Sequence, residues 1–484
     1  MLTTPQGPPP PRKRIPKDPK PRFRPARLLQ LDALLGCVDA QLPQEHLARQ
    51  VWAIIEKMET SAVEAEYSAL GRHGYHPKRL LAVWVYASLI GMHQSTQVER
   101  ACRTDAAFKW LCGGDSPSGP TLRRMRMKHA EFFAAAIEQT VIVGHSLGLV
   151  DLDALAVDSV RIRAHAASSA VRTVARSTER LKELAQIDVN TLNEEQRAAH
   201  ETKLAKHRSA IEACAAKDAA SIVTTNEAAA LMKFPSGASA PAHRTTVTAS
   251  GSATRFIIGV LVDADSTDHG KLSQAVTQAR DVLDRLGLRQ GKTMTIAADA
   301  GYYSEQDLHF ADQVREWADI LIPAAARGGR GAHFMGREQF KVHTDGTAIC
   351  PAGRKMLGPY ANDKVGKNFK WVGVGCPSCA LKPQCTSGKF RSLNIDAAKE
   401  KAREAMDERM SRPGAKERYN KRIATIEPVF SFVQHAMGFR RCSSRAPQTV
   451  RSEIMLKLLA YNIDRLIRAK RTGNKLLFVA ASLT

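Results

Sequence analysis

The sequence predicts a mixed α/β protein in which helical regions lie on both sides of a sheet-forming core. Segments typical of buried strands lie in the middle of the chain, between residues 152 and 322. Apolar residues at helical spacing dominate residues 28–149 and 397–471. The length of 484 residues and the apolar content of 44% allow a sizeable core and several domains.

The charge of the chain indicates a polyanionic partner. Its 71 Lys and Arg residues exceed its 48 Asp and Glu residues, which gives a formal net charge of +23 and a pI near 9.8. Nucleic acid suits this excess better than an anionic membrane does. A basic protein without such a partner is the alternative.

The N-terminus lacks the apolar stretch of a secretory signal, and the longest apolar run, residues 80–92, is too short to span a bilayer. Nine cysteines, an odd number, argue against a disulfide framework. We therefore expect an intracellular protein with no membrane partner.

Residues 1–27 contain nine prolines, eight basic residues and a single acid, Asp18. Such a segment has too little apolar surface to fold alone, so we expect a disordered or extended basic arm. It could contact DNA phosphates, or it could be a solvated tail.

Residues 28–150 are expected to form a helical DNA-binding domain. Residues 118–120, Ser-Gly-Pro, are typical of a helix start, and the helix that follows is basic in its first turns. A basic helix after a glycine-containing turn resembles a helix-turn-helix reader, while a helical bundle with a solvated basic face is the alternative. The candidate DNA-binding residues of this helix are Arg123, Arg124, Arg126 and Lys128.

Residues 151–323 are expected to form the sheet-containing core. The expected strands are residues 152–158, 244–250, 254–263, 293–299 and 320–322, with helices at 268–286 and 304–317 and a helical-hairpin insertion at 168–220. This order, with the long insertion after the first strand, is that of an RNase H-like fold, a mixed sheet flanked by helices.

An RNase H-like nuclease requires a carboxylate on the first strand, a second at the end of the fourth strand and a third on a later helix. Asp158, Asp299 and Glu427 occupy these positions. Three such oxygen donors could hold two Mg²⁺ ions roughly 3.5–4 Å apart for phosphodiester chemistry. Because Pro428 follows Glu427, we expect this acid at a helix start or at a kink.

Several segments of the chain resemble motifs of the bacterial insertion-sequence DDE transposases. They are residues 156–164, 297–303, 422–430, 438–441 and 450–466. The resemblance covers nearly the whole chain after residue 28, and the helical N-terminal region resembles the DNA-binding domain that precedes the catalytic core in one branch of the family.

This resemblance implies DNA strand transfer with Asp158, Asp299 and Glu427 as ligands of Mg²⁺, or of Mn²⁺ in its place. It also implies binding to terminal inverted repeats and target DNA, a homodimer on DNA, and a bacterial cytoplasmic location at the nucleoid. Residues 396–484 would complete the catalytic core.

The chain departs from the family pattern in three places. Ser159 follows the first acid where many relatives have Gly. The signature Tyr419, Arg422, Glu427 has one more residue before the acid than the commonest spacing. Gln434 stands where relatives often carry a Lys, which predicts a weaker phosphate contact.

Four cysteines mark a Cys-rich insertion at residues 324–395: Cys350, Cys376, Cys379 and Cys385. The Cys-x2-Cys turn is typical of a structural Zn²⁺ site, and free thiols in a reduced compartment are the alternative. Farther along, Arg440 and Arg441, together with Arg422, are the candidate DNA contacts near the third acid, unless they form only a solvated basic turn.

The sequence as a whole predicts a transposase that cleaves and joins DNA at the ends of an insertion sequence. Two alternatives remain open. One is a DNA-binding relative that has lost catalysis, and the other is a structure-selective nuclease without strand transfer.

Overall fold

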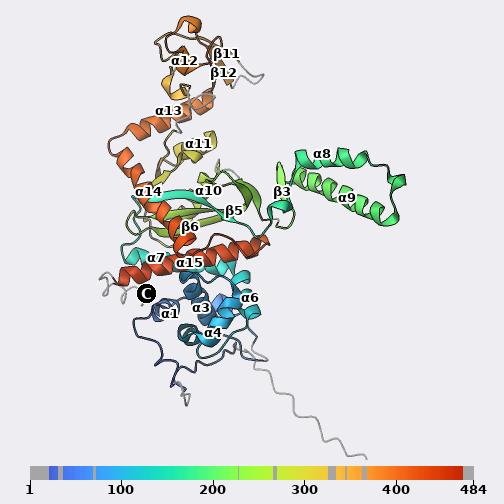
Figure 1. Cartoon of the computed structure of the whole chain (residues 1–484). Helices are drawn as coiled ribbons and strands as arrows, with labels where there is room; N and C mark the ends of the chain where they lie inside the picture. The colour runs from blue at the N-terminus through green and yellow to red at the C-terminus, as the bar shows by residue number, and fades with distance from the viewer. Residues whose placement is uncertain are drawn as a thin grey trace, which may run out of the picture.

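The computed structural model describes residues 21–30, 36–68, 72–226, 228–264, 270–324, 334–343, 346–361 and 368–471. Figure 1 shows a helical N-terminal part, a central sheet, a projecting helical hairpin and a small region at the far end from the N-terminal helices. None of the described helices has both the length and the apolar character needed to cross a bilayer.

The N-terminal part consists of short helices around one buried helix. These are α1 (Leu47–Ile55), α2 (Ser61–Glu64), α3 (Pro77–Leu89), α4 (Ser95–Thr104), α5 (Ala106–Leu111), α6 (Gly119–Lys128) and α7 (Ala130–Ser146). The longest apolar run forms α3, which begins at Pro77 and is buried from Leu80 to Ser88. The run that is too short to span a bilayer therefore forms a buried core helix.

The predicted basic arm is partly ordered. Residues 1–20 lie outside the described residues, but residues 21–27 pack on the N-terminal helices. The backbone amide of Arg24 donates to Gly74 O at 2.9 Å, and that of Arg27 donates to Gly113 O at 2.8 Å. Of the two forms expected for the arm, disordered or extended, free disorder does not describe residues 21–27, because backbone hydrogen bonds supply partners that composition cannot reveal.

The central sheet has the strand order of an RNase H-like fold. Its strands are β1 (Leu155–Arg163), β4 (Ala230–Lys233), β5 (Ser239–Ser250), β6 (Phe256–Asp263), β7 (Met294–Ala298) and β8 (Ala318–Leu321). β5 pairs antiparallel with β1, β4 and β6, whereas β7 pairs parallel with β1 and β8. The predicted fold class is confirmed, and β4 is an addition that the sequence did not suggest.

Helices α10 (Leu272–Arg285) and α11 (Glu305–Gln313) connect the later strands. Ser304 caps α11 as expected, since its hydroxyl accepts from Asp307 N at 3.2 Å. The carboxylate of Asp307 is buried and accepts from the amides of Gly270 and Leu272, so it ties the start of α10 to the start of α11.

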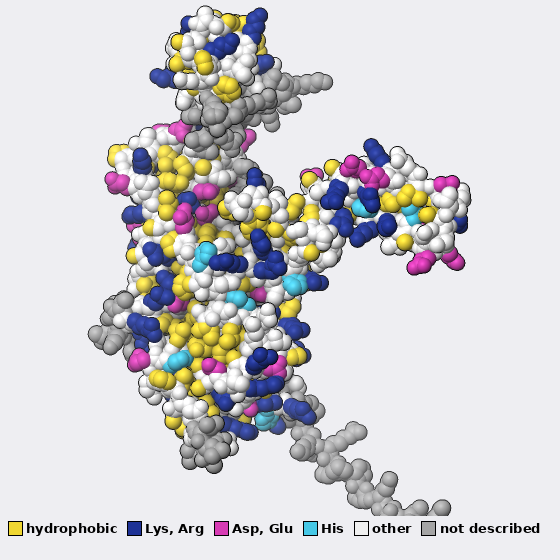
Figure 2. All heavy atoms as spheres, in the orientation of Figure 1, with side chains coloured by type: hydrophobic (Ala, Val, Ile, Leu, Met, Phe, Trp, Pro, Cys, Tyr) yellow, Lys and Arg dark blue, Asp and Glu magenta, His cyan; other side chains and the backbone are white. Residues whose placement is uncertain are grey.

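The insertion after β1 is the predicted helical hairpin, α8 (Val174–Ala185) and α9 (Glu194–Ala216). Its base is closed by β2 (Val171–Thr173) and β3 (Ser221–Val223), which pair antiparallel. The hairpin projects from the body of the molecule, with Lys and Arg side chains gathered toward its base (Figures 1 and 2).

The Cys-rich region contains two small sheets, formed by β9 (Lys341–Val342) with β10 (Ala348–Ile349) and by β11 (Leu357–Ala361), β12 (Asn368–Val372) and β13 (Ser392–Asp396). It lies at the end of the molecule beyond α13 (Ala397–Ser411) (Figure 1). Helix α14 (Ala415–Ser431) then returns along the sheet, a π-helical turn (Phe432–Ala436) follows, and α15 (Pro447–Arg471) closes the fold.

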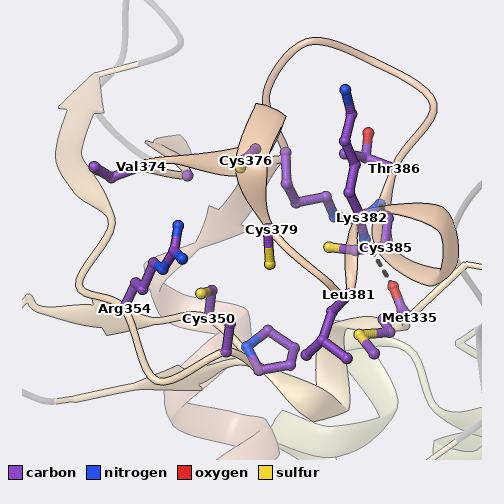
Figure 3. Close-up of a pocket in the computed structure, with 14 residues that line it drawn as sticks. Met335, Cys350, Arg354, Val374, Cys376, Cys379, Leu381, Lys382, Cys385 and Thr386 are labelled. Atoms are coloured by element: carbon purple, nitrogen blue, oxygen red, sulfur yellow. Dashed lines mark hydrogen bonds between the residues drawn. The ribbon is translucent and has the colours of Figure 1, made fainter.

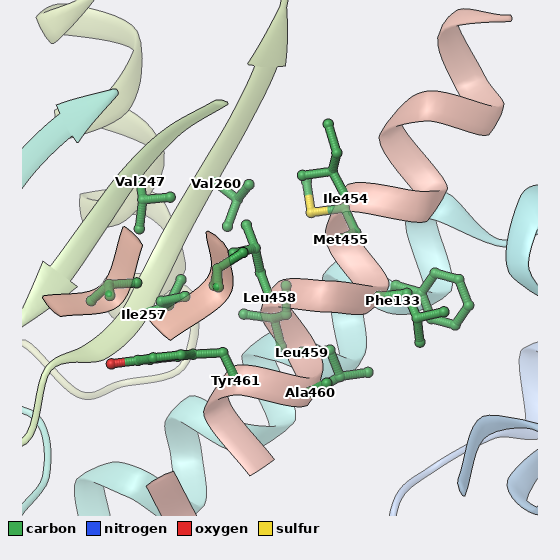
Figure 4. Close-up of a cluster of buried hydrophobic side chains, with 14 of the residues drawn as sticks. Phe133, Val247, Ile257, Val260, Ile454, Met455, Leu458, Leu459, Ala460 and Tyr461 are labelled. Carbon is green, nitrogen blue, oxygen red and sulfur yellow. The ribbon is translucent and has the colours of Figure 1, made fainter. Parts of the chain in front are cut away.

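Helix α15 joins the N-terminal helices to the sheet in one continuous apolar core. Leu458 and Tyr461 lie toward the strand residues Ile257 and Val260, and Phe133 of α7 packs on the other side of the helix (Figure 4). The buried Asn462 accepts from Ile257 N at 3.0 Å and donates to Thr140 Oγ1 at 3.0 Å. Helix α15 therefore contributes to the packing of both the N-terminal helices and the sheet.

A buried charged network holds the same junction. Glu453 of α15 accepts from the amides of Ser443 and Ser444 and lies 3.9 Å from a guanidinium nitrogen of Arg126. Lys457, one turn along α15, is fully buried and donates to Ser88 Oγ of α3 at 2.8 Å. Burial lowers the pKa of Lys457 to about 7.

This network corrects one predicted DNA contact. Arg126 is only 4% exposed, and it also donates to His93 O and to Ser443 Oγ. It is directed into the junction because it lies on the same face of α6 as the buried Leu122. Its predicted role in DNA binding is therefore wrong for this conformation.

Candidate active site

Two acids meet where β1 and β7 run side by side. The parallel register pairs Leu155 with Ile296 and Val157 with Ala298, so Asp158 and Asp299 are the next residues on the two strands. Side chains at corresponding positions of neighbouring parallel strands point to the same face. Two distant parts of the chain thus place their carboxylates next to each other.

Local hydrogen bonds orient both carboxylates. Asp299 accepts from Gly301 N at 2.8 Å and caps the short 3-10 turn after β7. Asp158 accepts from the amide of Ser159 at 2.7 Å. Serine therefore takes the place of the family glycine without loss of the carboxylate's orientation.

The environment of Asp158 disfavours its charge. Burial raises the pKa of this carboxyl, the neighbouring Asp299 raises it further, and Arg422 opposes both, with a net value of about 6. Two carboxylates crowded in a buried place repel each other, and a cation between them removes this repulsion.

Arg422 is the cation that the structure places beside Asp158. Its guanidinium donates to Asp158 Oδ2 at 2.7 Å from α14, and the two side chains are 10% and 19% exposed. We predicted Arg422 as a DNA contact; in this conformation it is bound to a carboxylate instead. The sequence contained a signal for this position, since Arg422 belongs to the same signature as Glu427.

Glu427 lies in the later part of α14 and is exposed. From Pro428 we expected Glu427 at a helix start or at a kink. The helix start is wrong, because α14 continues through the proline to Ser431. Proline lacks an amide hydrogen and leaves the carbonyl four residues earlier without its helical partner. That carbonyl, of Ala424, accepts from Arg255 Nε at 2.9 Å.

The three acids are not gathered in a common site in this conformation. Within the described ranges, no three Asp, Glu, His or Cys side chains are grouped closely enough to hold a metal ion. The pair Asp158 and Asp299 is in place, while Glu427 is on the helix that carries Arg422 and packs against β1 and β7.

The other predicted basic residues are solvent-exposed. Arg440 donates to Gln434 O at 3.0 Å, and Arg441 forms a backbone bridge with Arg163 at the end of β1. On α6, Arg123 and Arg124 are exposed, whereas Lys128 pairs with Glu66.

Sequence reasoning missed the basic character of β1 itself. Ser159, Arg161 and Arg163 alternate along this strand and therefore share one of its faces. Gln434 lies 3.5 Å from Arg161 O, so the segment after α14 follows β1 toward Arg163. The alternating arginines were a usable signal for a basic surface, but on the face of β1 opposite to the side chain of Asp158.

The four cysteines of the Cys-rich region line a single pocket, and all four are half-buried (Figure 3). The other cysteines are far from them in sequence, and Cys102, Cys112, Cys214 and Cys442 are buried.

Two protein-family models match the chain. Residues 349–467 match the transposase DDE domain, and residues 36–128 match a second transposase domain, DUF772. No curated protein and no solved structure matched significantly. With its RNase H-like sheet, the chain is thus a transposase, a DNA-processing enzyme.

The two matches lie in different parts of the chain. The DDE match contains the four clustered cysteines, Glu427 and most of α15, and the other match contains α1 to α6. Together they support an insertion-sequence DDE transposase.

Proposed function

We propose that this transposase cleaves and joins DNA at the ends of an insertion sequence, with Asp158, Asp299 and Glu427 as the ligands of two Mg²⁺ or Mn²⁺ ions. The observation that carries the proposal is the placement of Asp158 beside Asp299 on neighbouring strands. When bound, the ions would activate the attacking water or 3′-hydroxyl and stabilise the leaving oxygen.

The donor set fits a hard divalent cation. Both strand acids are carboxylates, and burial, followed by the neighbouring charge of Asp299, raises the pKa of Asp158. Arg422 neutralises part of that charge in the metal-free state. Glu427 would join the ligand set if α14 turns or shifts when DNA and metal bind.

A basic segment lies beside the strand that carries Asp158. The exposed Arg440 and Arg441 lie next to the end of β1, whereas Arg161 and Arg163 are on the face of that strand opposite to Asp158. Guanidinium groups bind phosphate oxygens and position a duplex without reading its sequence. The exposed Arg123 and Arg124 of α6 would contact DNA farther from the acids, and a homodimer would bring two element ends together.

The test of the function is a cleavage assay with linear DNA that carries the sequences flanking the gene on each side, in Mg²⁺. Joined products support the transposase proposal. Nicked products alone favour the nuclease without strand transfer, and binding without cleavage favours the inactive relative.

Mg²⁺ is expected to raise the melting temperature of the wild-type protein at pH 7.5 and to have a much smaller effect at pH 5. The pKa of the Asp158 carboxyl is 3.8 in the unfolded chain and about 6 in the folded chain, so the folded protein binds this proton more tightly. Without metal, the resulting stabilisation of the fold is fully present below pH 3.8 and is lost as pH rises through 6. The loss is roughly 3 kcal/mol of the free energy of unfolding, which a bound cation would recover. Thermal unfolding at both pH values measures it; an equal shift in Asp158→Asn would contradict the assignment.

Replacing Arg440 and Arg441 together by serine is expected to weaken DNA binding and to lower the slope of log K against log salt by about 2, roughly one for each phosphate contact. Fluorescence anisotropy at several salt concentrations measures the slope. Arg285→Ser on α10 removes one exposed charge of a surface ion pair and is the control. An unchanged slope in the double variant would place the DNA elsewhere.

A further inference from the structure

The Cys-rich region brings four thiols to one small cavity of about 20 Å³. Cys350 follows β10, Cys376 begins a 3-10 turn (Cys376–Ser378), Cys379 follows that turn, and Cys385 ends the short helix α12 (Lys382–Cys385). In Figure 3 the Cys350, Cys379 and Cys385 side chains point into the space between these segments, and Cys376 lies at its rim. Three separate pieces of backbone therefore contribute sulfur to one place.

Tight turns hold the cysteines in position. The amide of Cys350 donates to Arg354 O at 2.9 Å, and the amide of Gly353 donates back to Cys350 O at 2.8 Å. The amide of Cys379 donates to Cys376 O at 3.2 Å. Such turns present two thiols of a Cys-x2-Cys motif to one ion.

Gly373 leaves room for one of the sulfurs. A Cβ at this position would lie 2.6 Å from Cys376 Sγ and 3.4 Å from Arg391 O. A side chain there would have to displace the thiol. The backbone just after β12 thus comes close to the cavity because Gly373 carries no side chain.

The apolar core of this region is small for a separate body. It consists of Phe340, Ala348, Met356, Trp371 and Leu393, apart from the main core. A core of this size rarely stabilises a region of about 70 residues, and natural proteins of this size add disulfides or a structural metal. All four cysteines are free thiols, so no disulfide takes this role.

Positive side chains surround the cavity. Arg354, Lys382 and Arg391 line it, and the guanidinium of Arg354 donates to Gly375 O at 2.8 Å while that of Arg391 donates to Cys385 O at 3.1 Å. Four thiolates on one Zn²⁺ carry a net charge of −2. The three cations would balance that charge at short range.

We propose that Cys350, Cys376, Cys379 and Cys385 bind one structural Zn²⁺ that holds the Cys-rich region together. As the described residues stand, no three of these thiols are within joint reach of an ion. Binding draws the sulfurs to about 2.3 Å from the metal by rotation of side chains on the existing turns, and it releases four protons. With all four positions taken by protein, the ion is structural and takes no part in DNA cleavage.

The test is the zinc content of the full chain purified without chelator, measured by mass spectrometry. We expect about one equivalent of zinc in the wild type, release of that zinc by a mercurial reagent that reacts with thiols, and loss of it in Cys379→Ser. Cys37→Ser, a half-exposed cysteine far from the cavity, is the matched control and should retain its zinc. Asp299→Asn should retain it too, which separates this ion from the proposed catalytic ions.

A second measurement uses only the wild-type chain, in case the serine variant does not fold. Cobalt exchanged for zinc should show the thiolate-to-metal absorption of a tetrahedral four-sulfur site. Zinc below one tenth of an equivalent, with all four thiols reactive toward a disulfide reagent in the folded protein, would overturn the proposal. Zinc that stays bound in Cys379→Ser and Cys385→Ser would overturn it as well.

Discussion

Asp299→Asn is expected to abolish DNA cleavage and to leave the fold intact. The asparagine oxygen can still accept the hydrogen bond from Gly301 N that caps the turn after β7. It lacks the charge that a divalent cation requires, so the loss should be about a thousandfold or more, equivalent to several kcal/mol of transition-state stabilisation. The rate of strand cleavage on element-end DNA measures the effect.

Asp153→Asn is the control for this variant. Asp153 lies just before β1 and is exposed, so its loss should leave cleavage unchanged. A second comparison concerns Glu427, the acid on α14. Glu427→Gln should be as inactive as Asp299→Asn, whereas the control Glu417→Gln, on the same helix, should remain active. Full activity in Glu427→Gln would remove this residue from the ligand set while leaving the two strand acids in it.

Glu453→Ala is expected to have the largest effect on stability. The variant leaves Lys457 and Arg126 buried without the carboxylate that both face, and it removes the acceptor of two backbone amides. Removing one member of a buried charged group typically costs about 3–5 kcal/mol. Unfolding in urea, followed by circular dichroism, measures the loss.

Two controls show whether burial is the cause. Glu131→Ala removes an exposed partner of Arg451 and should cost less than about 1 kcal/mol. Lys457→Met keeps an apolar chain of similar length in the cavity and leaves Glu453 paired with Arg126, so it should be much milder than Glu453→Ala. A Glu453→Ala variant as stable as Glu131→Ala would mean that the network does not hold the junction.

Much of the core could be predicted from the order of its elements. A strand ending near Asp158, an insertion, two strands, a helix and a strand ending at Asp299 have few arrangements in a mixed sheet. The register of β1 with β7 then brings the two acids together. Local composition sufficed to predict these strands because each of them is a short apolar segment with clear limits.

The roles of individual charged residues could not be predicted in this way. Arg126 was grouped with Arg123 and Arg124 because all three follow the same helix start, yet only Arg126 is directed into the junction. The difference depends on the partners Glu453 and Ser443, more than 300 residues later. Charge patterns along a helix show which residues are cationic, but not which face a distant segment covers.

Pro428 is a similar case. By itself the proline predicted a helix start or a kink, whereas α14 continues because Arg255, from the turn before β6, takes the freed carbonyl of Ala424. The proline does remove a helical hydrogen bond, but a contact between residues 169 positions apart in the chain replaces that bond.

By itself the sequence predicted the RNase H-like fold and the positions of Asp158 and Asp299 on strands that must be neighbours. Periodicity and element order carry this information, since they act between residues close in the chain, while the transposase family was indicated by the resemblance of its motifs. Only the tertiary structure decided that Arg422 neutralises Asp158, that Arg126 is a core residue, and that four cysteines line one cavity. The first two depend on the burial of a charged group against a partner far away in sequence, and the third depends on how three separate turns fold together. All three are properties of packing.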